Sequence, residues 1–306
     1  MVCHQYQRKQ DLLVQDLADL GKDQAWMDGL RVADFTVRPE KPAERAASKA
    51  FIARYEWLGG APTRGYNHHV YLVEHTALKL LAGVSWFCSP NANSKLLPGA
   101  REVLLARGAT VSWAPATHDQ GHLGSWMTAR AVKLLVQDLN EPVIVCGYSD
   151  PEAGEEGVIY SSLNWYCLGS EHGTTKMYRD PSLVKPFSKG RWFSDRRFRA
   201  HSTWKRFIKK ENIKGIVWRE PTKVKGTSWN PDWKASGDAG KALKAAVEKF
   251  RASCEVKDQP AKKKWCFILG RGQKETQHLR ALFVSSAVGE GLRDLGRARQ
   301  ASVRKN

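Results

Sequence analysis

The stretch GYSDPEAGEEGVIYSSLNWYCLG, residues 147–169, holds residue types from which a catalytic site can be built. The apolar run Val143–Cys146 predicts a buried strand, and Asp150 stands where that strand would end, at one edge of a sheet. A carboxylate there can accept a proton, and a tyrosine such as Tyr160 can donate one. The same residues also suit structural roles, since Asp150 could cap a helix while Tyr160 and Trp165 could pack in the core.

Charge is distributed unevenly along the chain, whose net charge is +18. Residues 1–180 hold 18 Lys and Arg against 20 Asp and Glu, whereas residues 181–306 hold 31 against 11. Such a basic region can bind a polyanion by displacing its counterions, and aromatic residues among the basic ones suit stacking on bases. We therefore expect contacts with nucleic acid phosphates from Arg191, Arg196, Arg197, Arg199, Lys205 and Arg206. The alternative is that the charge only confers solubility and the aromatic residues are core.

Other features of the sequence narrow the class of protein. It has no apolar run of 18 residues, and its N-terminus lacks the apolar segment of a signal peptide. The six cysteines show no CxxC pair and no metal-ligand spacing, which favours buried free thiols in a reducing compartment. We expect a soluble cytoplasmic protein with no membrane partner. The oligomeric state stays open, a homodimer included.

Periodicity predicts an alternation of helices and strands. We expect helices at residues 10–24, 41–55, 125–139, 159–169, 240–254 and 273–283, and strands at 68–74, 79–88, 101–114, 142–150 and 262–270. The rest of residues 181–260 reads as irregular. The predicted organisation is an N-terminal helical extension (1–42), a core (43–180), a basic aromatic-rich insertion (181–261), a final core strand and helix (262–285) and a disordered basic tail (286–306).

This order of elements resembles the acyl-CoA-dependent N-acetyltransferase fold, known as GNAT: an α/β fold with a mixed central sheet flanked by helices. In that fold two central strands splay apart, and the loop after the long strand opens a helix whose N–H groups can hold a pyrophosphate. Here that loop contains Gly121 and Gly124, which permit close backbone approach, and Ser125 at the expected N-cap. The resemblance implies acetyl-CoA or another acyl-CoA as cofactor. The usual Q/R-x-x-G-x-G/A signature is replaced by QGHLGS.

Four segments of the sequence resemble a particular family more closely than the fold in general: LARGA, GSWMTARAVKLL, YSDPEAGEEGVIYSSLNWYCLG and KKKWCFILGRGQKETQHLRAL. They resemble the phage Mom family, and the likeness covers residues 45–180 and 262–285. Mom proteins convert the N6 of adenine in double-stranded DNA to a carbamoylmethyl (acetamido) derivative, which protects phage DNA from restriction in the host cytoplasm. The resemblance therefore implies a DNA-modifying transferase.

Site residues follow from this resemblance. It places Asp150, Tyr160, Ser125 and Tyr55 in the active site, Tyr55 in the loop after the second helix, and assigns Arg107 to an anionic cofactor or a DNA phosphate. The family pattern also implies a metal, iron, held through a histidine. Arg54 stands in that histidine's place here, which leaves His68 or His69 as substitutes.

The chemistry suits these residue types. The exocyclic amine of adenine is a poor nucleophile and needs a proton acceptor, for which Asp150 is a candidate. The base must also be flipped out of the duplex, and Trp165, Tyr166 or Tyr55 could stack on it. Two alternatives remain: an N-acyltransferase that acts on another amine (protein, small molecule or aminated DNA base), and a non-catalytic DNA-binding protein with this fold.

Overall fold

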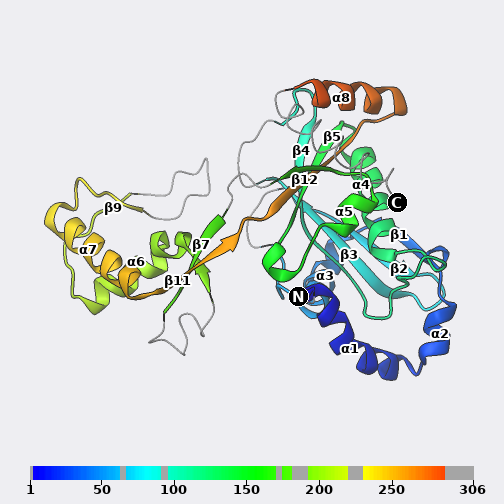
Figure 1. The fold of residues 1–306 in the computed structure, drawn as a ribbon, viewed down its shortest axis with the longest axis horizontal. Coiled ribbons are helices and arrows are strands. Elements are labelled where there is room, and N and C mark those ends of the chain that lie inside the picture. Colours follow the sequence, from blue (N-terminus) through cyan, green and yellow to red (C-terminus); the bar gives the residue numbers. More distant parts are fainter. Residues whose placement is uncertain are drawn as a thin grey trace, which may run out of the picture. The chain divides into compact units, whose positions relative to one another are not determined.

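The chain folds into two compact units (Figure 1). Unit 1 comprises Met1–Glu171 with Lys262–Asn306, and unit 2 comprises His172–Ala261. The insertion predicted from the sequence at 181–261 falls within unit 2, which starts earlier than that boundary. The computed structural model describes residues 3–62, 67–90, 96–169, 174–180, 192–219 and 230–286.

Unit 1 alternates helices and strands in the order that periodicity predicts, with additional elements that the sequence did not predict: the helix at Gln24–Gly29, the strands at Phe35–Pro39 and Tyr166–Gly169, and three short 3-10 helices. Its elements are α1 (His4–Leu20), α2 (Gln24–Gly29), η1 (Val32–Asp34), β1 (Phe35–Pro39), η2 (Pro42–Glu44), α3 (Arg45–Tyr55), β2 (His69–His75), β3 (Leu80–Cys88), β4 (Arg101–Thr110), α4 (Leu123–Leu139), β5 (Val143–Ser149), η3 (Pro151–Ala153), α5 (Val158–Ser162), β6 (Tyr166–Gly169), β12 (Lys263–Leu269) and α8 (Gln273–Ser285). No helix formed by the described residues is long and apolar enough to cross a bilayer.

The strands of unit 1 form one seven-stranded sheet in the order β1-β2-β3-β4-β5-β12-β6. Neighbours are antiparallel, except that β4 and β5 run parallel. The sheet is thus mixed, with helices flanking it (Figure 1). This is the GNAT-like α/β fold that the order of elements predicts.

The two parallel strands separate part of the way along their length. They pair only where Arg101–Leu104 faces Val143–Cys146, although β4 continues to Thr110. On its other side β4 carries a bulge, since Trp86 faces Arg107 while the next residue of β3 faces Leu105. Because a bulge bends its strand and increases the local twist, it is a physical cause for β4 to diverge from β5. The separated ends create space between two neighbouring strands of the sheet.

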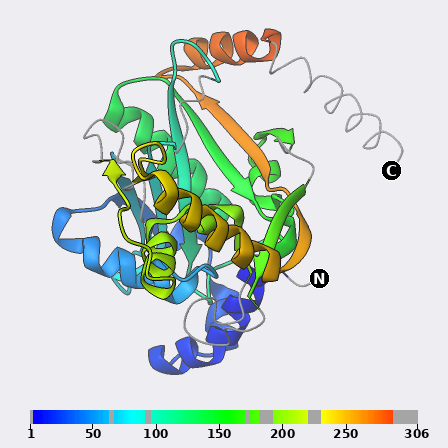
Figure 2. The ribbon, with the colours of Figure 1, turned by 90° about the vertical axis from the view of Figure 1, so that its left-hand side faces the viewer.

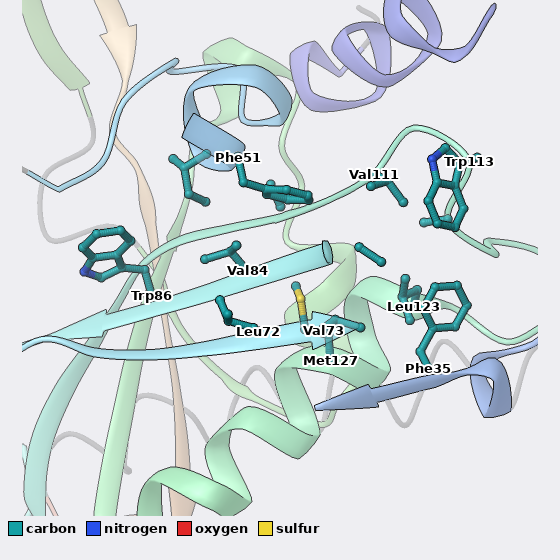
Figure 3. Packing of buried hydrophobic residues seen from close by; sticks show 14 of the residues in the cluster. Phe35, Phe51, Leu72, Val73, Val84, Trp86, Val111, Trp113, Leu123 and Met127 are labelled. Atoms are coloured by element: carbon teal, nitrogen blue, oxygen red, sulfur yellow. The ribbon is translucent and has the colours of Figure 1, made fainter. Parts of the chain in front are cut away.

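One hydrophobic cluster fixes helix α4 against the sheet (Figure 3). Met127 of α4 packs with Val73 and Val84 on the sheet face. A Cβ at Gly83 of β3 would lie 2.8 Å from the Met127 Sδ, so glycine there allows the close approach of the helix. The N-terminal turn of α4 is thereby held beside the separated part of β4.

The helix predicted at 159–169 is wrong beyond its first turn. Helix α5 ends at Ser162, and Asn164 adopts a left-handed backbone with φ of 57°. Asparagine tolerates that conformation, which ends a helix. The chain then continues as β6, which pairs with β12 because Trp165 and the residues after it gain burial against that strand.

Unit 2 has more regular structure than the sequence indicates. The described part of residues 181–260, predicted to be irregular except for one helix, forms several elements around a core of Phe198, Trp204, Phe207, Leu243 and Phe250. Helices α6 and α7 pack together, as Figures 1 and 2 show. Its elements are β7 (Thr174–Arg179), β8 (Phe193–Ser194), η4 (Asp195–Arg199), α6 (His201–Lys210), β9 (Trp218–Arg219), β10 (Asn230–Pro231), α7 (Gly237–Ser253) and β11 (Glu255–Pro260).

Candidate active site

A cavity of about 730 Å³ opens in unit 1 where β4 and β5 separate, and we call it the β4/β5 cavity. Its walls come from separate places in the sequence that the fold brings together. They are α1 with Cys3, the loop after α3, the end of β3, β4 from Leu104 onward, the first turns of α4, the end of β5, the segment that leads into α5, and Lys262 before β12. Carboxylate, amine, guanidinium and phenol groups all reach this cavity, from Glu56, Glu155, Glu156, Lys9, Arg107, Tyr6, Tyr148 and Tyr160.

Tyr160 stands on the cavity wall, as its assignment to the active site requires. Its ring packs against those of Trp165 and Trp265, with centroids 4.9 and 5.7 Å away. Its hydroxyl donates a hydrogen bond of 3.4 Å to the carbonyl oxygen of Tyr148. Burial raises the pKa of Tyr160 well above its usual range, so the phenol stays protonated at neutral pH. The side chain therefore holds a proton that it can donate, although burial makes it a weaker acid than an exposed tyrosine.

Asp150 lies beside the cavity and makes structural contacts. It is 6% exposed, and it is the N-cap of η3, where its Oδ1 accepts a 3.1 Å hydrogen bond from the Glu152 N–H. Its Oδ2 lies 2.9 Å from the Lys262 Nζ. Ser149 lines the cavity, whereas Asp150 does not. The geometry thus shows the capping role, and a catalytic role for Asp150 stays a prediction.

The predicted N-cap of α4 is wrong. The helix begins at Leu123 with His122 as N-cap, so Ser125 already lies in the first turn. The sequence favours Ser125 because serine is a common cap, but the chain enters the helix earlier. The Ser125 Oγ instead lies 3.1 Å from the Oγ of Ser162, which joins α4 to α5.

The two glycines of this loop have different environments. Gly124 lines the cavity, and a Cβ there would make only an ordinary contact with Ile159 at 3.7 Å. Gly121 has a φ of +78°, and a Cβ there would lie 2.9 Å from the Val32 side chain. Glycine is required at position 121 by backbone conformation and packing, and this residue is not on the cavity wall.

Tyr55 is the last residue of α3 and not part of the following loop. Its ring packs on Phe51, with centroids 4.5 Å apart, in the cluster between α3 and the sheet. It does not line the cavity, whereas the next two residues, Glu56 and Trp57, do. The direction of the chain as it leaves α3 decides which residues line the cavity. The predicted site residue, Tyr55, thus lies one position before the first residue of this loop that lines the cavity.

Glu56 is a buried acid that the sequence analysis missed. It is 7% exposed, and its Oε2 lies 3.7 Å from the Nε of Arg107 on β4. The Arg107 Nε donates its hydrogen bond to the carbonyl of Gly60, at 3.0 Å. Burial raises the pKa of Glu56; the charge of Arg107 and hydrogen bonds from the backbone of Leu58 and Gly59 oppose this shift, and the charge of Glu155 adds to it. The available signal was a single acid between aromatic residues in ARYEW.

Lys9 brings a positive charge to the cavity from α1, which the sequence analysis set apart as an extension. Its Nζ donates a hydrogen bond to the Thr110 Oγ1 at the end of β4. Burial lowers the pKa of Lys9 to about 8. An anionic group in the cavity would favour the charged form of this amine.

The residues around the cavity fit an acyl-CoA. The part of β4 beyond Leu104 has no pairing partner on β5, and an extended amide-bearing chain can add to such a strand edge. Lys9 would face the negative charges of the molecule, and the volume is that of a typical small-molecule site. When bound, the thioester would supply an activated acyl group.

The residues do not fit the metal that the family resemblance implies. Among the described residues, no three His, Cys, Asp or Glu side chains gather to hold an ion. Arg54 forms an ion pair of 2.5 Å with Asp16 on α1. The Nδ1 of His68 accepts a 2.9 Å hydrogen bond from the Trp86 Nε1, and both His68 and His69 line a separate cavity of about 210 Å³. The groups expected to bind a metal are thus engaged in other contacts or placed away from the β4/β5 cavity.

Two residues expected to stack on a flipped base lie elsewhere. Trp165 is 4% exposed and packs between Tyr160 and Phe267. Tyr166 packs against Phe283 of α8 and does not line the cavity. Both are core residues because β6 pairs with β12. The aromatic residues that do line the cavity are Tyr6, Trp57, Tyr148 and Tyr160.

The basic residues predicted to contact DNA lie in unit 2, except that Arg191 is outside the described residues. Residues 172–261 hold 22 Lys and Arg against 9 Asp and Glu, a net charge of +13. Arg196, Arg199 and Lys205 are exposed, Arg197 is partly buried, and Arg199 pairs with Asp195 at 3.1 Å.

Arg206 differs from these exposed residues. Its guanidinium lies over the rings of Phe207 and Phe250, 5.0 and 5.1 Å from their centroids. Burial lowers the pKa of Arg206. Its side chain is thus part of the packing of unit 2, as are Trp204, Trp218 and Trp233. The spacing of basic residues in the sequence does not by itself distinguish a packed arginine such as Arg206 from an exposed neighbour.

Comparisons with known proteins leave the family open. No family model matches the chain, and no curated protein does. Among solved structures, mutant forms of the spermidine/spermine N-acetyltransferase SpeG from Vibrio cholerae match with 12% identity over 47% of this chain and 84% of theirs, at a TM-score of 0.31. A GCN5-related N-acetyltransferase from Sphaerobacter thermophilus matches with 13% identity over 78% and 97%, at 0.31. A tandem GNAT protein from the clavulanic acid biosynthesis pathway matches with 11% identity over 78% and 99%, at 0.35. The fold assigned above rests on the strand order of unit 1.

Proposed function

We propose that unit 1 is a GNAT-like transferase that modifies an amine within the β4/β5 cavity. The observation that carries this proposal is the position of Tyr160, a phenol held in its protonated form on the wall of a cavity between two separated strands. Transfer to an amine releases a leaving group that needs a proton, and a neutral phenol beside it can supply one.

We infer further that the amine is the N6 of adenine in double-stranded DNA and that the product is the carbamoylmethyl derivative. The support is the resemblance to the Mom family, whose most specific run, D-P-x-x-G-x-x-G-x-I-Y-x-x-x-N-W, spans Asp150–Trp165 and includes seven consecutive cavity residues, Gly154–Tyr160. The excess positive charge of unit 2 suits a DNA duplex. The function that follows is protection of phage DNA from restriction in the host cytoplasm.

Adenine would have to leave the helical stack to reach such a cavity. Enzymes that modify bases flip the target nucleotide and hold it between aromatic or apolar side chains. Trp57 is placed for this role, since it lines the cavity and its indole N–H donates a 2.7 Å hydrogen bond to Glu155. That bond fixes the ring orientation on the cavity wall.

A second candidate is an N-acyltransferase that acts on another amine. The strand edge of β4 and the charge of Lys9 favour an acyl-CoA donor, and plain transfer from a thioester yields an N-acyl amine instead of a carbamoylmethyl one. A protein that only binds DNA would make no covalent product at all. The chemical product therefore distinguishes the three functions.

The test is mass spectrometry of nucleosides from plasmid DNA co-expressed with this protein. We expect a deoxyadenosine derivative heavier by a carbamoylmethyl group, together with resistance of the plasmid to several restriction enzymes. DNA from cells that express Tyr160→Phe is the matched control and should lack both. An N-acylated nucleoside would support the second candidate, and unmodified DNA from cells with folded protein would contradict both DNA-modifying functions.

A further inference from the structure

Glu56 combines burial, access to the cavity and an oxygen without a hydrogen bond. It follows α3 directly and lines the β4/β5 cavity, although its side chain is only 9% exposed. The Oε2 of Glu56 is buried and has no hydrogen-bond partner among the described residues. A buried carboxylate oxygen without a donor is costly, so such a group calls for an explanation.

The other carboxylates near the cavity are already engaged or exposed. Both oxygens of Glu155 accept hydrogen bonds, one from the Trp57 Nε1 at 2.7 Å and the other from the Asp150 N–H at 3.0 Å. Glu156 is exposed to solvent. Asp150 caps η3 and pairs with Lys262. Only the Glu56 Oε2, among the described carboxylate oxygens that line the cavity, is both buried and without a hydrogen bond.

Arg107 places a positive charge close to the Glu56 carboxylate but makes no hydrogen bond to the Glu56 Oε2. Its Nε donates to the Gly60 carbonyl at 3.0 Å and its Nη1 to the Ala106 carbonyl at 2.6 Å. The guanidinium stays 3.7 Å from the Glu56 Oε2, which limits the charge penalty of the buried carboxylate without a hydrogen bond to that oxygen. Glu155 is the other charged group that acts on Glu56, and it has the opposite effect.

We propose that Glu56 is the proton acceptor for the attacking nucleophile in the β4/β5 cavity. This assignment deepens the acyltransferase form of the proposed function, in which a thioester is the donor, and rests on it. With an acyl thioester as donor, the amine nitrogen forms a bond to the acyl carbon and passes its proton to the Glu56 carboxylate. The carbon–sulfur bond breaks, its electron pair leaves with sulfur, and the resulting thiolate takes the proton of the Tyr160 hydroxyl.

This role explains why a carboxylate is buried at this position. Burial raises the pKa of Glu56, and a base is most effective when its pKa lies close to the working pH. Water can replace the amine as nucleophile and needs the same proton acceptor. Slow hydrolysis of an acyl thioester therefore reports on Glu56 without any DNA, so the base can be tested even if adenine is not the acceptor.

The experiment compares wild type, Glu56→Gln and Glu56→Asp in thiol release from acetyl-CoA between pH 5 and 9. Glutamine keeps the shape but accepts no proton, so we expect thiol release to fall by about 100-fold or more. The acid limb of the wild-type pH profile should disappear in Glu56→Gln. Aspartate is shorter and should restore part of the rate together with the acid limb. Glu141→Gln, which removes an exposed carboxylate elsewhere in unit 1, should match wild type.

Stability provides a readout that does not depend on activity. Since folding raises the pKa of Glu56, the ionised form destabilises the protein as pH rises through that pKa. Glu56→Gln should therefore have a higher Tm than wild type at pH 8 and lose this advantage at pH 4. Such a result, with acetyl-CoA still raising the Tm, shows that the variant is folded and binds the donor.

The outcomes separate the two proposals. Unmodified DNA with thiol release that depends on Glu56 rejects adenine as the acceptor and supports Glu56 as the base. If folded Glu56→Gln releases thiol at the wild-type rate with the same acid limb, Glu56 is not the proton acceptor. Wild-type protein that releases no thiol at any pH also overturns the assignment.

Discussion

The ring of Tyr160 lies directly over Gly147 of β5, so closely that a Cβ on Gly147 would stand 2.7 Å from its Cε1 and 2.8 Å from its hydroxyl oxygen. No real side chain tolerates such distances. The strand therefore supplies a surface without side-chain atoms, and the phenol occupies that space on the cavity wall. The position of the Tyr160 ring can therefore be changed by a substitution in the strand, at Gly147, as well as by a substitution of the tyrosine itself.

Gly147→Ala should displace the Tyr160 ring from the cavity wall. We expect the overpacking to cost about 1–3 kcal/mol of unfolding free energy and nucleoside modification to fall strongly, because the phenol loses its position. Chemical denaturation and nucleoside mass spectrometry measure the two effects. A variant that keeps full modification would show that the position of Tyr160 has no role in the reaction.

Tyr160→Phe removes only the hydroxyl and its 3.4 Å hydrogen bond to the Tyr148 carbonyl. We expect a stability loss of about 1 kcal/mol, since a single neutral hydrogen bond is removed. The packing with Trp165 and Trp265 should remain. Modification should be abolished if the phenol donates the proton to the leaving group, whereas near-normal modification would leave Tyr160 with a packing role only.

The substitution Asp150→Asn distinguishes the N-cap role of Asp150 from a catalytic role. Asparagine caps helices about as well as aspartate, and the ion pair with Lys262, whose side chain is 49% exposed, contributes little. The Tm should therefore change little, whereas Asp150→Ala should lose about 1 kcal/mol of stability. The catalytic hypothesis predicts loss of modification in the asparagine variant. If its activity stays normal, Asp150 has a structural role and no catalytic one.

Binding of an anionic donor should depend on pH through Lys9. The amine is charged below its pKa of about 8 and neutral above it, so affinity for acetyl-CoA should fall as pH rises through that value. The rise in Tm caused by saturating acetyl-CoA reports this affinity. Lys9→Met should reduce the Tm rise at pH 7 and remove its pH dependence. An unchanged pH dependence in this variant would mean that another group controls donor binding.

The exposed basic residues of unit 2 should control DNA affinity by pairing with phosphates. Replacing Arg196, Lys205 and Lys209 with alanine should weaken binding to any duplex. The slope of log affinity against log salt should fall by about one unit for each phosphate that the variant no longer neutralises. Arg206 is left intact because it packs on Phe207 and Phe250.

The matched control replaces three exposed lysines of unit 1, Lys49, Lys133 and Lys274, with alanine. This variant removes the same charge and should keep both the affinity and the salt slope. Fluorescence anisotropy with a labelled duplex measures both variants. If the two triple variants behave alike, net charge rather than the surface of unit 2 governs DNA binding.

The sequence by itself determined the order of helices and strands in unit 1 and hence its fold. Strands such as Val143–Ser149 are continuous apolar runs, and α4 carries apolar residues three and four apart, so local periodicity is enough to predict them. The sequence also pointed to Tyr160 on the segment after β5, a residue whose side chain lines the cavity. Its run of glycines and aromatic residues after the strand is specific enough to draw attention to that place.

Only the tertiary structure decided which side chains share the cavity. Glu56 and Lys9 lie far from Tyr160 in the sequence, and no local pattern relates them. Their meeting depends on where α1 and α3 pack and on the separation of β4 from β5. The same holds for Arg206, whose burial against Phe250 of α7 comes from packing within unit 2. Periodicity in the sequence shows which face of a helix or strand is apolar. The distances between these elements are set by the complete packing of the core, and the chemistry of the site depends on those distances.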